Sequence, residues 1–121
     1  MFKELGDLID SMHYGVSNYD ELDINRIVTN VIKDLFVENG VDTEIINTPI
    51  YVYENRVHSA VARKFSDETD LKEYIKKAKE SEYKIFLYGA TPYKIISRDA
   101  LTPSVVLAVR FIEIDKNINM E

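Results

Sequence analysis

The residues of this sequence that are able to perform acid–base or nucleophilic chemistry stand far apart along the chain. Its two histidines are His13 and His58, and neither has a second ligand near it at the spacing of a metal site. The chain has no cysteine, which excludes a disulfide framework, a thiolate zinc site and a cysteine nucleophile. We therefore expect no metal and no cofactor.

Motifs for phosphate, calcium or hydrolysis are missing as well. No two of the four glycines have the spacing of a dinucleotide fingerprint or a P-loop. The acidic run of Asp20, Glu21 and Asp23 lacks the alternating oxygen ligands and the glycine of an EF-hand loop. There is no G-x-S-x-G elbow and no H-E-x-x-H. These absences favour a protein that is not an enzyme.

Carboxylates and arginines of the predicted strands offer one further possibility. Glu54 lies at a strand end and Glu113 in the last strand, while Arg63 and Arg110 also project from strands. The interpretation that we favour is a set of structural ion pairs at the rim of a sheet. The alternative is an acid–base pair in a cleft.

Tyrosine is the enriched residue type, with eight in the chain. Tyr51 and Tyr53 share one face of a predicted strand, opposite Ile50 and Val52. If the aliphatic face is buried, the tyrosines are either covered by a partner, as tyrosines often are at interfaces, or packed at the edge of the core. The candidate interface residues are Tyr51, Tyr53, Arg63 and Arg110.

The length of the chain limits the number of domains it can form, and its charge limits the kinds of partner it can bind. The 121 residues suit a single domain spanning 1–121. The net charge is −6, and it is uneven: residues 1–49 hold ten carboxylates and three cations, whereas 50–121 hold eleven and twelve. An acidic surface repels phosphate backbones and anionic lipids, so we expect neither tight nucleic-acid binding nor membrane docking. The acidic half either only keeps the protein soluble or forms a face that resembles DNA or lets DNA slide past.

No targeting segment is visible. No apolar run approaches the roughly 20 residues of a membrane span. The first residues, MFKELGDLIDSM, lack the basic start and apolar stretch of a secretion signal. We expect a cytoplasmic protein.

Apolar periodicity predicts the helices. A short amphipathic helix is expected over 1–12. The clearest helix is expected over 24–38, with Asp23 as its N-cap and Gly40 at its left-handed end. A third helix is expected over 67–80, with acids in its first turn and lysines later, in the order that suits the helix dipole.

Strands are predicted between and after these helices. Residues 44–65 are expected to form a strand pair, a hairpin broken at ENR, and residues 83–114 to form the closing strands. We place a turn at Gly89–Pro92, between YKIFLYG and YKIIS. The last strand, SVVLAVRFIEI, is apolar on both faces, which is typical of a central strand. Residues 115–121 are a polar tail.

These elements predict an α+β fold: a mainly antiparallel sheet with two principal helices packed on one face, plus a short N-terminal helix. From residue 23 onward their order resembles that of phage tail-terminator (tail-completion) proteins, in which a helix, a strand pair, a second helix and closing strands follow one another. The segment that carries the resemblance is YKIISRDALTPSVVLAVRFIEI. The N-terminal helix and the inserted YKIFLYG stand outside that order.

The resemblance implies a ring of subunits, often six, that seals the tail tube and joins it to the head. The partners would be other copies of the chain and other structural proteins of the virion. The protein would then be cytoplasmic during assembly and afterwards part of the virion.

Two other functions fit the sequence. A small acidic inhibitor or immunity-type protein would bind one host or toxin protein through its acidic first half. A small ligand-binding domain or enzyme would instead have a deep pocket lined by tyrosines, Arg63 or Arg110.

Overall fold

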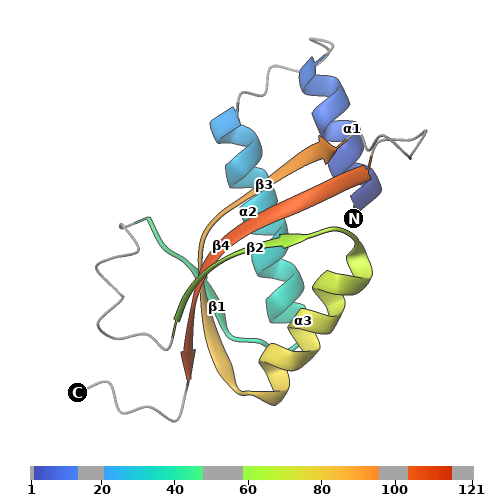
Figure 1. Cartoon of the computed structure of the whole chain (residues 1–121). Coiled ribbons are helices and arrows are strands. Elements are labelled where there is room, and N and C mark those ends of the chain that lie inside the picture. Colours follow the sequence, from blue (N-terminus) through green and yellow to red (C-terminus); the bar gives the residue numbers. More distant parts are fainter. Residues whose placement is uncertain (1, 14–20, 48–58, 96–103, 116–121) are drawn as a thin grey trace.

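The computed structural model describes residues 2–13, 21–47, 59–95 and 104–115 (Figure 1). The helices are α1 (Phe2–His13), α2 (Glu21–Glu38) and α3 (Glu68–Glu80). The strands are β1 (Thr43–Ile45), β2 (Ser59–Phe65), β3 (Tyr83–Ile95) and β4 (Ser104–Asp115). The predicted α+β class is confirmed.

The strands form a four-stranded sheet in the order β1-β3-β4-β2. Two of the pairings, β3 with β4 and β2 with β4, are antiparallel, while β1 pairs with β3 in parallel. The sheet is therefore mixed, and not antiparallel throughout. β4 lies between two other strands, which confirms the prediction that the last strand is central.

The predicted hairpin over 44–65 is wrong. β1 and β2 lie at opposite edges of the sheet, each beside a different partner. The physical reason is that alternation of apolar and polar residues marks a segment as a strand without indicating which strand it pairs with. Residues 48–58, which include Tyr51, Tyr53 and Glu54, lie outside the described part of the chain.

The predicted turn at Gly89–Pro92 is also wrong, because β3 runs without a break from Tyr83 to Ile95. A register shift between Leu87 and Gly89 marks a β-bulge at Tyr88. Ala90 donates its N–H away from β4, to the side chain of Thr29. Pro92 lies two residues further on the same edge, where no ladder hydrogen bond is required of it.

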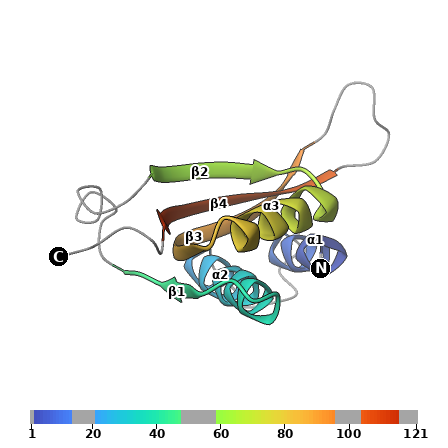
Figure 2. The same cartoon turned by 90° about the horizontal axis from the view of Figure 1, so that it is seen from below.

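All three helices pack on one side of the sheet (Figure 2). Their apolar stripes meet one row of strand side chains in a single core, which confirms the predicted packing of helices on one face. Figure 2 shows the helices together below β2 and β4. The largest fully buried side chains of this core include Phe36, Phe65, Phe111, Ile32, Leu71 and Leu107.

The ends of the helices agree with the predictions to within one residue except at the start of α2. That helix begins at Glu21, so Asp23 lies inside its first turn and is not the N-cap. The carboxylate of Asp67 caps α3 by accepting from the N–H of Asp70 at 2.8 Å. Glu68 and Asp70 then occupy the first turn and Lys77 and Lys79 the last, as the helix dipole favours.

A C-terminal cap at Gly40 joins α2 to β1. Gly40 has φ +84°, and its N–H donates to the carbonyl of Val37 while that of Val41 donates to the carbonyl of Phe36. This is the Schellman pattern, with its apolar contact supplied by Val41 and Phe36 in the core. The predicted left-handed end is confirmed.

We expect Thr29→Val to destabilise the fold by about 1–3 kcal/mol. The hydroxyl of buried Thr29 donates to the carbonyl of Asn25 at 2.5 Å and accepts from the N–H of Ala90 at 3.0 Å. Valine has nearly the same shape but leaves that buried N–H without an acceptor. Thr29→Ser is the control, because it keeps the hydroxyl. Equal stability of the threonine and valine proteins in urea unfolding would contradict this account.

We expect Gly40→Ala to cost about 1 kcal/mol or more of unfolding free energy. The positive φ is strained for alanine, and the added Cβ would lie 3.2 Å from Cε of Lys79. The same substitution in a Lys79→Ala background should cost less, because only the backbone strain remains. Thermal unfolding measures both. If Gly40→Ala lowered the unfolding free energy in neither background, the cap would not need glycine.

Candidate interaction surface

The side of the sheet opposite the helices carries a second row of large side chains. In β4, Leu107, Val109 and Phe111 belong to the core under the helices. The alternate residues of β4 point to the other side. We call that side the helix-free face, because every helix of the described residues lies on the opposite side of the sheet. It is formed by Lys64 of β2, by Lys84, Phe86, Tyr88 and Tyr93 of β3, and by Val106, Ala108, Arg110, Ile112 and Ile114 of β4.

A separate apolar cluster lies on the helix-free face. Ile112 and Ile114 of β4 pack with Ile46, which follows β1. Phe86 and Tyr88 are half-buried against these three residues. No residue of a helix belongs to this cluster, in contrast with the core on the other side. Ile46, Ile112 and Ile114 are themselves only 7%, 0% and 8% exposed, so the face has a buried apolar centre of its own, with Phe86 and Tyr88 half-buried beside it.

Cations lie over the aromatic rings of this face. The guanidinium of Arg110 lies 4.7 Å from the ring centroid of Tyr88, and the ammonium of Lys84 lies 5.1 Å from that of Phe86. Lys64 reaches Tyr93 across β4 at 5.7 Å. Contacts of this kind contribute about 0.5–1 kcal/mol each at exposed sites, so they favour these positions of the rings and cations modestly.

The structure places one predicted interface residue on this face and one on the other. Arg110 lies on the helix-free face. Arg63 lies on the helix side, with its guanidinium 5.1 Å from the ring centroids of both Phe65 and Tyr74. Tyr51 and Tyr53 lie outside the described residues. The structure therefore does not bring the two arginines together.

Glu113, predicted to pair with an arginine, accepts a hydrogen bond from the hydroxyl of Tyr74 at 2.6 Å. Tyr74 is 5% exposed and packs against the rings of Phe36, Phe65 and Phe111. Burial, and then the hydrogen bond to Glu113, raises the pKa of Tyr74 well above its ordinary value. The phenol therefore stays protonated and serves as a hydrogen-bond donor inside the core.

Two lysines of β3 form ion pairs with the acidic first half of the chain. Lys84 lies 3.4 Å from Glu44 and 3.8 Å from Asp42. Lys94 pairs with Asp10 of α1 at 2.5 Å. All these groups are partly exposed, so each pair contributes little to stability. Their effect is to leave fewer unpaired charges where β1 and α1 meet β3.

The described residues offer no metal centre. His13 is the last residue of α1, and His58 lies outside the described residues. Within the described ranges, no group of three or more histidine, aspartate or glutamate side chains could hold a metal ion. None of the helices in the described part of the chain is long and apolar enough to cross a membrane.

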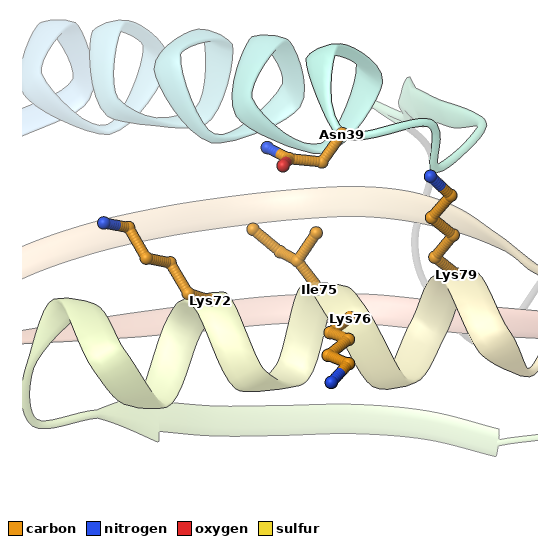
Figure 3. A pocket seen from close by; sticks show the side chains of 5 residues that line it. All are labelled: Asn39, Lys72, Ile75, Lys76 and Lys79. Atoms are coloured by element: carbon orange, nitrogen blue, oxygen red, sulfur yellow. The ribbon is translucent and has the colours of Figure 1, made fainter.

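Three surface grooves are lined by described residues. One of about 250 Å³ lies between α2 and α3 (Figure 3), one of about 370 Å³ lies beside Gly40 and Tyr83, and one of about 220 Å³ lies between α2 and Tyr88. Neither Arg63 nor Arg110 lines any of the three. Of the residue types expected to line a ligand pocket, Tyr83 and Tyr88 each line one of these grooves.

Sequence reasoning named Arg110 of the helix-free face and predicted that SVVLAVRFIEI is apolar on both faces, but it did not name the β3 residues of that face. Their signal was in YKIFLYG, where Lys84, Phe86 and Tyr88 alternate with Ile85 and Leu87. The contacts of Lys64 and Arg110 depend on cross-strand register, which no local pattern contains.

A scan against protein-family models, a search of curated proteins and a search of solved structures found no match for this chain.

We expect the free energy of unfolding to fall as the pH rises above about 10, where unfolded tyrosine begins to ionise. The raised pKa of Tyr74 means that the folded state keeps a proton that the unfolded chain loses. Tyr74→Phe should weaken this dependence and cost about 1 kcal/mol at neutral pH through the lost hydrogen bond. Urea unfolding from about pH 8 to about pH 11 measures both effects, with Tyr93→Phe as the control. If the pH dependence of the unfolding free energy were unchanged in Tyr74→Phe, its assignment to Tyr74 would be contradicted.

Proposed function

We propose that this protein is a structural assembly subunit that acts by docking, and that the helix-free face is a surface through which it docks. Its specific role in this proposal is that of a ring-forming tail-terminator or head–tail connector subunit of a phage. It would contact other copies of itself and other structural proteins of the virion. It would be cytoplasmic during assembly and then part of the virion.

The composition of the helix-free face is the observation that carries the proposal. It places Phe86, Tyr88 and Arg110, residue types enriched where proteins bind one another, around a cluster of buried isoleucines. Cation–ring contacts favour the positions that Tyr88 and Phe86 occupy before any partner arrives. Side chains that are already ordered lose less conformational entropy on binding. The face is thus suited to a specific protein contact.

The continuity of β3 supports the virion role. Because YKIFLYG and YKI lie in one strand, the last two described strands, β3 and β4, form one long antiparallel pair. The segment that stood outside the family order as an insertion is part of that closing pair. The sequence of elements from α2 onward then follows the tail-terminator order more closely, although β1 and β2 do not pair with each other.

We expect the protein to form a defined oligomer in solution, and the double variant Phe86→Ser, Tyr88→Ser to lower its mass. Val31→Ser is the matched control, because it removes an exposed apolar side chain, 40% exposed, from α2. Sedimentation velocity over a wide concentration range measures the mass, and circular dichroism verifies that each variant stays folded. Arg110→Glu should weaken association without removing an apolar group.

A strictly monomeric wild-type protein at high concentration would contradict the ring. A monomer that captures one host or toxin protein at a fixed ratio would instead favour the inhibitor function.

A further inference from the structure

The groove between α2 and α3 is lined by Asn39, Lys72, Ile75, Lys76 and Lys79, and we call it the lysine groove. Figure 3 shows Lys72 and Lys79 extending toward α2, with Ile75 between them, while Lys76 points away. Lys72 and Lys79 are seven residues apart, which places them about 10 Å apart along the helix axis. The two ammonium groups thus lie on either side of Ile75, which forms the apolar floor of the groove and is only 4% exposed.

The lysines of this groove form no close ion pair within the described residues, although Lys72 interacts electrostatically with Glu68, one helical turn before it. Lys84 and Lys94 of β3 each lie within 4.0 Å of an acid, whereas Lys72, Lys76 and Lys79 form no such pair in that part of the chain. Lys79 instead lies over Gly40, at the C-terminal end of α2. The groove therefore presents positive charge that the described part of the fold leaves without an ion pair.

Unpaired negative charge lies on the outside of α2. Asp34 and Glu38 are exposed, and neither forms an ion pair within the described residues. They are four residues apart, about 6 Å along the helix axis, which is less than the roughly 10 Å between Lys72 and Lys79. Val37 beside them is 51% exposed. This short stretch of α2 therefore combines two carboxylates with an apolar side chain, as the lysine groove combines ammonium groups with Ile75.

We infer that the lysine groove of one copy binds the Asp34–Glu38 stretch of α2 from a second copy. This inference rests on the proposed assembly function and gives it a second contact. Carboxylates are favoured over nucleic-acid phosphates as the ligand because the whole chain carries a charge of −6 and repels a phosphate backbone. The two surfaces share no residue, although Glu38 directly precedes Asn39 of the groove, so the contact is head-to-tail, the kind that closes into a ring or continues as a filament.

A contact made of exposed ion pairs is sensitive to salt. Ionic screening acts over about 10 Å at 0.1 M salt and about 3 Å at 1 M. We therefore expect the oligomer to weaken as the salt concentration rises, while the contact through the apolar helix-free face persists.

Two charge-reversed proteins test the inference. One carries Lys72→Glu and Lys79→Glu, and the other carries Asp34→Lys and Glu38→Lys. Each alone should raise the dissociation constant of the head-to-tail contact by at least about tenfold. An equal mixture of the two should regain the wild-type mass, because the reversed groove then meets the reversed stretch and each native surface meets its native counterpart. Lys77→Glu is the matched control, since Lys77 lies on the same helix outside the groove.

The outcomes separate this inference from the proposed function. An oligomeric wild type whose mass is unchanged in both charge-reversed proteins would overturn the inference and leave the assembly function standing. So would a mixture that stays dissociated, or an equal loss in Lys77→Glu. A wild type that is monomeric at every concentration would instead overturn the assembly function, and this contact with it.

Discussion

The central strand β4 is apolar on both of its faces, and the rest of the structure follows from that. The row that contains Leu107, Val109 and Phe111 requires a cover, which the three helices supply. The other row, with Ile112 and Ile114, lies on the same strand and must point the opposite way. Burying the first row therefore presents the second on the far side of the sheet, where Ile46, Phe86 and Tyr88 gather around it. One strand thus determines both the core and the helix-free face.

The edge of β3 shows that a helix also bonds to the sheet directly, in addition to covering one face of it. The bulge at Tyr88 shifts the register of β3 by one residue, and the hydroxyl of Thr29 receives the N–H of Ala90 just beyond it. Pro92 then occupies the next position on that edge and offers no donor to another strand. The result is a strand edge protected by α2, while the aromatic side chains of the same strand remain on the helix-free face beside Arg110 and Lys64.

Local sequence patterns were sufficient to predict the helices, but they were insufficient to predict how the strands pair in the sheet. The stripe over 24–38 and the charges over 67–80 predicted α2 and α3 because a helix is stabilised by neighbours within its own segment. The partner of a strand is distant in sequence, so β1 and β2 were wrongly paired with each other. Gly89 and Pro92 indicated a turn, but a bulge and an unpaired edge accommodate both residues within a strand. For the same reason the contact of Tyr74 with Glu113, and that of Lys64 with Tyr93, had no sequence signal.

The central proposal is that this protein works by contact through the helix-free face. The most direct measurement is a methyl NMR dilution series that follows isoleucine side chains from both sides of the sheet. If the claim holds, the methyl signals of Ile46 and Ile114 on the helix-free face shift or broaden as the protein is concentrated, while that of Ile32 in the core does not change. Signals of Ile46 and Ile114 that stay constant at every concentration, and also when assembly partners are added, would contradict it.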